Sequence, residues 1–101
     1  MVLAKHKRIK DKKVIAAIRT NCCEVCGAYT TIEPHHVNTV GAGGGDIKEN
    51  LIQLCTEHHI AAHDGALSKS ELIEIIAQRE GRSINEIYVI NRRAMGHDVP
   101  F

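Results

Sequence analysis

The sequence predicts a single α+β domain of 101 residues, in which two short antiparallel strands are flanked by helices on both sides. Three observations predict this class. A β-branched and aromatic run stands in the first half, serine capping signals precede apolar helical repeats in the second half, and four cysteines accompany seven histidines. Because only three side chains are aromatic, the core is small, and we expect a bound metal to stabilise it.

The first 20 residues form a basic arm with a formal charge of +6, whereas the remaining 81 residues carry −5. Such an arm attracts a phosphate backbone, although a solvated charge run is the plainer alternative. Within it, Asp11 is expected to cap a short helix that ends near residues 20–21 and repeats apolar residues at helical spacing. The residues expected to contact nucleic acid are Lys5, Lys7, Arg8, Lys10, Lys12 and Lys13.

The strands are expected around a histidine pair. Residues 29–32 are β-branched and aromatic, and residues 35–40 follow across Glu33 and Pro34, so the two segments are predicted to pair as antiparallel strands. Pro34 cannot donate a ladder hydrogen bond, which favours a strand start or an edge. The glycine-rich run 41–46 is expected to be a mobile or tightly turned loop, and it lacks the lysine and hydroxyl residues of a phosphate-binding P-loop.

Capping signals define the helices of the second half. After a short apolar segment at 51–54, Thr56 is predicted to cap a helix that Gly65 ends. Ser68 and Glu71 form a capping box before a second helix, which Gly81 closes. A third helix opens with the same signal, and the last two helices are expected to form a hairpin against the metal core. The signal residues of the third helix are Ser83 and Glu86, and its expected apolar side is Ile84, Ile87, Tyr88 and Met95.

The cysteines predict a closed zinc site. Two tight pairs, Cys23 with Cys26 and Cys55 with His58, supply four ligands for tetrahedral zinc and leave no position for water. The alternative is that these cysteines are small buried residues. Cys22 could replace Cys23, but Cys23 gives the two-residue spacing that one turn can close, so Cys22 is interpreted as a buried or spare thiol.

The remaining histidines have the arrangement of a second, open site. His59 and His63 are four residues apart and lie on one face of a helix, whereas His58 points about 100° away. His35 and His36 are adjacent on a strand, so they point to opposite faces and are expected to have two roles, ligand and base. The histidines near the two chain ends, His6 and His97, are assigned no role.

Together these motifs resemble the HNH endonucleases, whose core is the ββα-metal (His-Me finger) fold. The chain is most similar to small zinc-stabilised proteins of phage and prophage type, over a core of about residues 22–64. The basic arm and helix at 1–20 and the helices at 68–96 lie outside the resemblance. Many relatives have a cysteine where His58 stands, so either His58 or His59 could be the structural ligand. The matching residues are Cys23, Cys26, Gly27, His35, His36, Asn50, Leu51, Leu54, Cys55, His58, His59 and His63.

The resemblance implies a role for each residue of the open site. His35, His59 and His63 would hold a catalytic divalent ion, His36 would be the general base, and Asn50 would orient the loop and the base. Neutral imidazole can take a proton from water near pH 7. The ion is expected to be Mg²⁺ or Mn²⁺ by resemblance, while three imidazoles also suit Zn²⁺ or Ni²⁺.

The expected function is metal-dependent hydrolysis of DNA by a monomer that nicks one strand at a time and leaves a 5′-phosphate and a 3′-hydroxyl. The partner is DNA, held mainly through phosphates, and no nucleotide cofactor or membrane partner is expected. The alternative is a non-catalytic zinc module that binds nucleic acid. Free cysteines, and the lack of an export signal or apolar transmembrane run, predict the reducing cytoplasm.

Overall fold

The computed structural model describes residues 7–96, and it confirms the α+β class. A two-stranded antiparallel sheet is combined with four α-helices and two 3₁₀ turns in this range. No helix among residues 7–96 is long and apolar enough to cross a membrane. In chain order the elements are α1 (Lys12–Ala17), β1 (Ile32–His36), η1 (Val40–Ala42), η2 (Lys48–Asn50), β2 (Leu51–Cys55), α2 (Thr56–Asp64), α3 (Lys69–Glu80) and α4 (Ile84–Ala94).

The sheet differs from the predicted hairpin, because the histidine-bearing strand β1 pairs with β2. The predicted strand at 29–32 is wrong apart from its last residue, and Tyr29 in that segment is largely exposed. All five residues of β2 are buried, so the apolar run at 51–54 is the strand that the core requires. Sequence proximity favoured the wrong partner.

Pro34 lies in the middle of β1 without costing a ladder hydrogen bond. It stands opposite Gln53, whose backbone groups are bonded on the other edge of β2. The Gln53 amide donates to Glu24 Oε2 at 2.6 Å, and the Glu24 amide donates to the Gln53 carbonyl at 2.8 Å. Because Gln53 turns both groups away from β1, this register tolerates a residue without an N–H.

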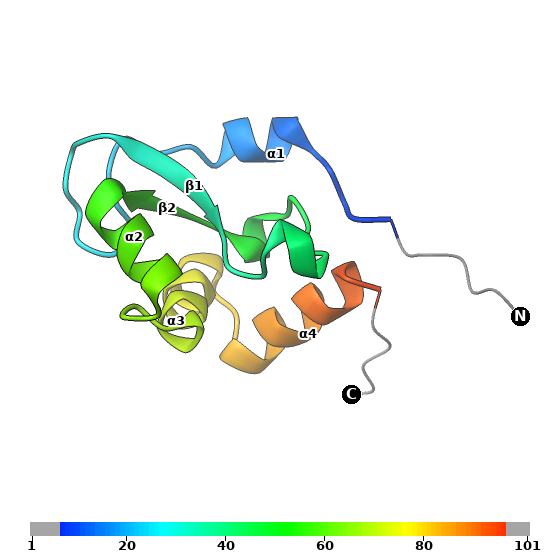
Figure 1. Ribbon diagram of the computed structural model, residues 1–101. Helices are drawn as coiled ribbons and strands as arrows, with labels where there is room; N and C mark the ends of the chain where they lie inside the picture. Colours follow the sequence, from blue (N-terminus) through cyan, green and yellow to red (C-terminus); the bar gives the residue numbers. More distant parts are fainter. Residues whose placement is uncertain (1–6, 97–101) are drawn as a thin grey trace, which may run out of the picture.

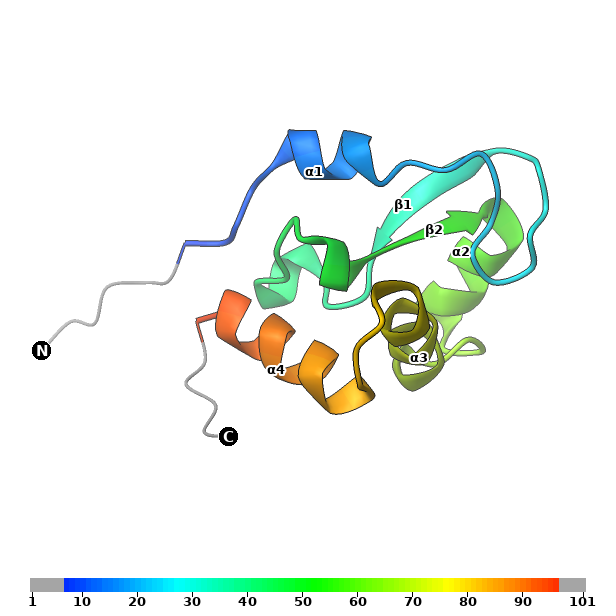
Figure 2. The same cartoon turned by 180° about the vertical axis from the view of Figure 1, so that it is seen from behind.

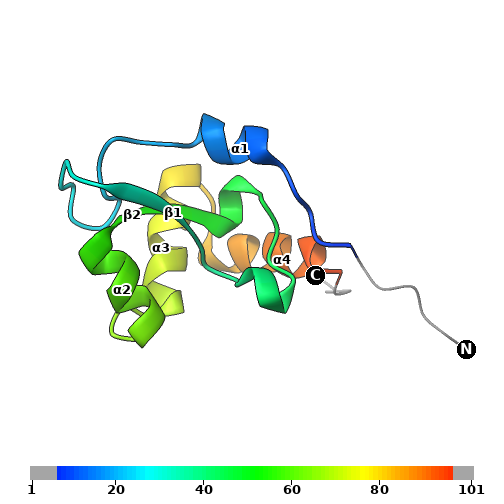
Figure 3. The ribbon, with the colours of Figure 1, turned by 45° about the horizontal axis from the view of Figure 1, so that its top comes forward.

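The sheet separates α1 from the other helices. Figure 1 shows α1 on one side of the strands and α2 and α3 on the other. The view from behind in Figure 2 shows α3 and α4 as consecutive helices joined by a short connection, and the tilted view in Figure 3 shows that they cross at a steep angle. Figure 3 again leaves α1 and α2 on opposite sides of the strands. Adjacent residues of β1 therefore reach two different environments.

The ends of α1 and α2 show which local signals held. Asp11 caps α1, as predicted, by accepting hydrogen bonds from the Lys13 and Val14 amides. The helix ends at Ala17, short of the predicted residues 20–21, and none of its residues is buried to extend it by packing. For α2 the cap is the last residue of β2 and not Thr56, because the helix starts directly after the extended strand. Gly65, with φ of 84°, ends α2 as predicted.

The serine caps of α3 and α4 are confirmed, whereas the predicted apolar face of α4 is confirmed only at Ile87. Ser68 and Ser83 each accept a hydrogen bond from the amide three residues on, and Glu86 completes the capping box. Along α4 the structure buries Ile87, Val89 and Asn91. Ile84 and Tyr88 are about half exposed, since this helix turns its other side to the core.

The core lies between the sheet and α3, and it includes the candidate metal ligands Cys23 and Cys55. Arg79 of α3 ties this region together. Its Nη1 donates to both Glu24 carboxylate oxygens, at 2.9 and 3.1 Å, and to the Leu51 carbonyl at 3.0 Å. The cysteine turn is thereby fixed against β2 and the C-terminal helices, which holds the candidate sites on one rigid support.

Candidate metal centres and active site

Three cysteines and a histidine converge on one point beside the core. The donor atoms of Cys23, Cys26, Cys55 and His58 all lie within 4.8 Å of one another, and this cluster could hold a metal ion. His58 Nδ1 is 3.2 Å from Cys55 Sγ and 3.7 Å from Cys23 Sγ. Sulfur and nitrogen ligands of tetrahedral zinc stand about 3.6 Å apart when the bonds have their usual lengths. The four residues therefore fit zinc.

Local structure explains why these four side chains meet. Cys23 and Cys26 lie in a tight turn, closed by hydrogen bonds from the Gly27 amide to the Cys23 carbonyl and from the Cys23 amide to the Ala28 carbonyl. Gly27 has φ of 74°, which favours glycine. Cys55 ends β2, and a histidine three residues later lies in the first turn of α2, so strand and helix present their ligands to the same turn.

The sulfurs of this cluster favour a cation electrostatically. Burial alone would raise the pKa of Cys23, but hydrogen bonds from the backbone amides of Cys55, Cys26 and Val25 lower it to about 7. The Ala28 amide pulls the pKa of Cys26 down, yet burial and the neighbouring sulfurs of Cys23 and Cys55 leave it raised. Three thiolates so close repel one another, and a bound cation removes that penalty.

A second group, His35, His59 and His63, forms where β1 meets α2. Their candidate ligand atoms also lie within 4.8 Å of one another. The His35 ring centroid is 5.1 Å from that of His59 and 5.2 Å from that of His63, and the two helix rings are 4.8 Å apart. Exposure rises from buried His35 to exposed His63, so this group is open on one side.

Glu33 supports the open group from β1. Its Oε2 accepts a hydrogen bond from His59 Nδ1 at 3.1 Å, which leaves His59 Nε2 as the free ring nitrogen. A carboxylate on the second nitrogen is the usual support of a metal-binding histidine. Burial, followed by the charges of His59, His63 and His36, lowers the pKa of His35 to about 4. His35 is therefore neutral near pH 7 and keeps a lone pair for a cation.

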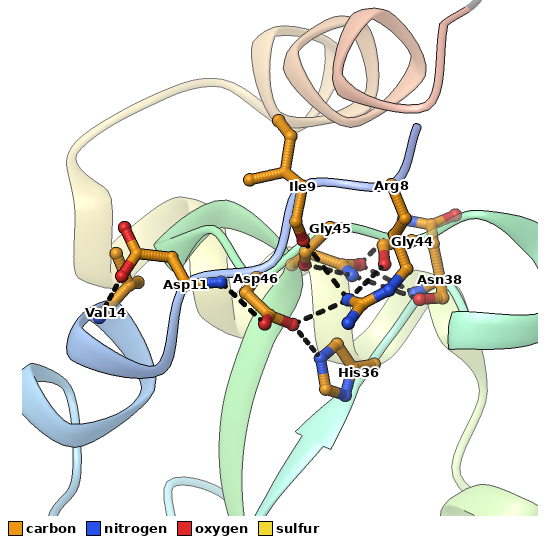
Figure 4. Close-up of polar contacts among 10 residues, drawn as sticks. Arg8, Ile9, Asp11, Val14, His36, Asn38, Gly44, Gly45 and Asp46 are labelled. Carbon is orange, nitrogen blue, oxygen red and sulfur yellow. Dashed lines mark hydrogen bonds and ion pairs between the residues drawn. The ribbon is translucent and has the colours of Figure 1, made fainter. Parts of the chain in front are cut away.

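His36 points to the opposite face of β1 and contacts Asp46. Its Nε2 is 2.7 Å from Asp46 Oδ1, which Arg8 Nη1 also contacts at 2.7 Å, while the Asp11 amide donates to Oδ2 at 2.9 Å (Figure 4). Burial would raise the pKa of Asp46, but these hydrogen bonds and the Arg8 charge lower it to about 2. An ionised carboxylate only accepts, so His36 donates from Nε2, and in the neutral ring Nδ1 carries the lone pair.

Both histidines of the pair nevertheless line one hollow of about 190 Å³, together with Thr39, His59 and His63 among others. The hollow therefore joins an imidazole that an ionised carboxylate orients to an open group of three imidazoles. Such a site can remove a proton from water and hold a divalent cation within reach of the same substrate.

Asn50 fixes the glycine-rich loop and does not contact His36, the residue that it was expected to orient. Its Oδ1 accepts from the Asn38 amide and from Asn38 Nδ2, and its Nδ2 donates to the carbonyls of Asn38 and Gly45. These four bonds use the full capacity of the side chain, so none remains for His36. The loop is tightly turned, as one of the two predicted alternatives states, but its start is the 3₁₀ turn η1 rather than irregular chain.

Sequence reasoning missed Asp46 and Glu33 as site residues. Asp46 closes the glycine run and Glu33 precedes the histidine pair, so both are close in sequence to recognised motifs. A carboxylate that ends a glycine loop was a usable signal. Which histidine each acid contacts depends on the pairing of β1 with β2, which the predicted hairpin did not contain.

The basic arm has two parts in the structure. Arg8 is turned inward, with only 18% of its side chain exposed, because it binds Asp46 and the Gly44 carbonyl. Four lysines remain exposed, so their contact with nucleic acid stays a prediction, and Lys5, His6 and His97 lie outside the described residues. The exposed lysines are Lys7, Lys10, Lys12 and Lys13.

Comparison of the chain with protein-family models, with curated proteins and with solved structures found no match.

Proposed function

We propose that this chain is a metal-dependent DNA endonuclease of the HNH type, built on a ββα-metal core of β1, β2 and α2. One observation carries the proposal: His36, hydrogen-bonded to ionised Asp46, lines the same hollow as the open group of His35, His59 and His63. In this proposal the 101 residues act as one domain, with the basic arm in front of the core and the helical hairpin behind it.

The chain's own residues supply the proton transfer. Asp46 holds the Nε2–H of His36, so Nδ1 is free to accept a proton from the attacking water. The charge that develops on the imidazolium is stabilised by the Asp46 carboxylate, as in other aspartate–histidine pairs. Arg8 keeps that carboxylate ionised and in place. Asn50 holds the loop that carries Asp46.

The open histidine group supplies a cation site. When bound there, Mg²⁺ or Mn²⁺, or a Zn²⁺ or Ni²⁺ ion that the imidazoles also suit, supplies Lewis-acid stabilisation of the leaving 3′ oxygen. His35 lies deepest, and Glu33 fixes the ring of His59. The Cys23 cluster is closed, and we assign zinc at that place a purely structural role. One such unit cleaves one strand, so nicking by a monomer is the expected outcome.

A non-catalytic zinc module is the second candidate, and the closed cysteine cluster favours it equally. That module would need Cys23, Cys26, Cys55 and His58 but would have no use for the Asp46–His36 pair. The two candidates therefore differ in whether His36 matters for anything besides folding.

Nicking of supercoiled plasmid by protein freed of host nucleases separates the candidates. With Mg²⁺ or Mn²⁺ we expect wild type and His97→Ala, a matched loss of one histidine with no assigned role, to relax the plasmid. His36→Ala should lose about a hundredfold or more of the rate, the usual contribution of a general base. Equal nicking by both variants would refute the base, and absence of nicking with every divalent ion would favour the binding module.

A further inference from the structure

A groove of about 300 Å³ lies between α3 and α4, outside the candidate active site. Its apolar walls are Ile73 of α3 and Ile84 and Tyr88 of α4. Ile84 and Tyr88 are 52% and 51% exposed, which is high for large apolar side chains at the meeting of two helices. Nothing in the core explains this exposure, because α4 packs inward through other residues.

The charged groups of the groove have one sign. Lys69 and Arg92 line it, and no carboxylate does. The Arg92 guanidinium lies over the Tyr88 ring, 5.8 Å from its centroid, so a delocalised cation covers one face of the ring and the other face is the stacking surface. Planar aromatic rings linked by phosphates match this combination of stacking surface and positive charge.

Asn91 is a buried polar residue of the groove lining. This residue is 2% exposed, and its Nδ2 donates to the Glu49 carbonyl at 2.9 Å and to the Ile87 carbonyl at 3.1 Å. These two bonds fix α4 against the segment before β2 and against its own preceding turn. Its Oδ1 is fully buried and has no hydrogen-bond partner among the described residues, so the recognition of a ligand is left to the exposed side chains of the groove.

The groove adjoins the candidate active site through consecutive residues. Asn38 lines the groove, while Thr39 and Val40 line the hollow that contains His36. Lys69 of the groove also donates to Asn38 Oδ1, which fixes the end of α3 to this segment. Neighbouring Cα atoms are about 3.8 Å apart. The groove and the hollow are therefore lined by adjoining residues of one backbone segment.

We propose that the groove binds an unstacked base of the substrate strand beside the scissile phosphate, which makes single-stranded or locally unpaired DNA the preferred substrate. The base lies against Tyr88 and between the isoleucines. Lys69 and Arg92 hold the flanking phosphates. This inference rests on the proposed nuclease function, but it concerns binding and can be measured without cleavage.

The test compares two twelve-nucleotide single strands of equal charge, oligothymidylate and a fully abasic chain, by fluorescence anisotropy with no added divalent ion. Stacking is worth roughly a tenfold to hundredfold preference for the strand with bases. We expect wild type to show that preference, Tyr88→Ala to lose it, and Tyr88→Phe, which keeps the ring, to retain it. Tyr29→Ala is the matched control, because it removes the chain's other tyrosine, which is exposed outside the groove.

The proposal also predicts that Tyr88→Ala leaves affinity for duplex DNA almost unchanged, since stacked bases cannot enter the groove. It is overturned if wild type binds the two single strands equally, if Tyr88→Ala keeps the preference, or if that variant weakens duplex and single strands alike. If the protein nicks plasmid but its preference for the strand with bases does not depend on Tyr88, the groove proposal is refuted and the nuclease proposal stands. If the preference depends on Tyr88 but no nicking occurs, the nuclease proposal is refuted and the groove remains a nucleic-acid-binding site.

Discussion

The two candidate metal sites share α2 but differ in the number and type of their ligands and in what surrounds them. The cluster of Cys23, Cys26, Cys55 and His58 is joined to the hydrophobic core, and its two tight pairs surround one point. In the group of His35, His59 and His63 the first residue is buried and the last is exposed, and all three line a hollow. Adjacent residues of one helix thus contribute to a cluster beside the core and to a group beside an open hollow.

The difference shows how neighbouring residues of one helix acquire separate tasks. His58 and His59 are adjacent, so they point about 100° apart, one to the cysteine turn and the other to β1. The contacts also address the alternative of His59 as structural ligand. His59 lies beside His35 and Glu33, while His58 Nδ1 faces the sulfurs of Cys23 and Cys55. The first site should therefore control folding, and the second should control chemistry.

The largest effect is expected from Cys23→Ala. Loss of a structural zinc ligand removes a contribution on the order of 10 kcal/mol, more than a domain of this size can spare. We expect the far-ultraviolet circular dichroism of the folded state to be lost at 25 °C. His63→Ala, which shortens an exposed side chain of the other site, should unfold within a few degrees of wild type. Similar unfolding temperatures for both variants would contradict the assignment of folding to the cysteine cluster and of chemistry to the histidine group.

Asp46→Asn is the next largest change and acts on chemistry. The amide keeps the shape of the side chain but cannot hold the Nε2–H of His36 or stabilise its charge as the carboxylate does. We expect the nicking rate to fall on the order of 10²- to 10⁴-fold with little change in the affinity for DNA. Asp64→Asn, at the exposed end of α2, is the control and should nick normally. A wild-type nicking rate for Asp46→Asn would show that Asp46 has no role in the reaction.

A smaller effect is expected from Gly44→Ala in the loop. A Cβ at this position would lie 1.8 Å from the Asn38 carbonyl oxygen and 2.9 Å from Asn50 Nδ2, so the loop must shift. We expect a loss of about 1–3 kcal/mol in the free energy of unfolding, measured by urea denaturation, together with slower nicking. Gly41→Ala meets nothing within 4 Å and should leave both unchanged.

The last predicted effect is the pH dependence of stability caused by His35. Its pKa is about 4 in the folded chain and near 6.5 when unfolded, so below pH 6.5 the unfolded chain binds the proton more readily. The free energy of unfolding should therefore fall as the pH drops from about 6.5 to about 4. His35→Gln should have a flatter profile in urea denaturation without added divalent ions. Because both proteins carry the same cysteines, parallel profiles would exclude His35 as the source.

The features that followed from the sequence are those that local spacing determines. Two pairs of ligands three residues apart, and two helical histidines four residues apart, indicated both groups of side chains, and the serine caps placed α3 and α4. Local signals could not select β2 as the partner of β1, since that choice depends on which apolar run the core buries. The contacts of Asp46 and the exposed side of α4 depend on the same tertiary packing.

The zinc content of purified protein after dialysis tests the division of the histidines most directly. We predict one tightly held zinc per chain for wild type and for His63→Ala, and none for Cys55→Ser, although both substituted residues belong to the same strand–helix unit. Loss of that zinc in His63→Ala, or its retention in Cys55→Ser, would contradict two separate sites, one closed and one open.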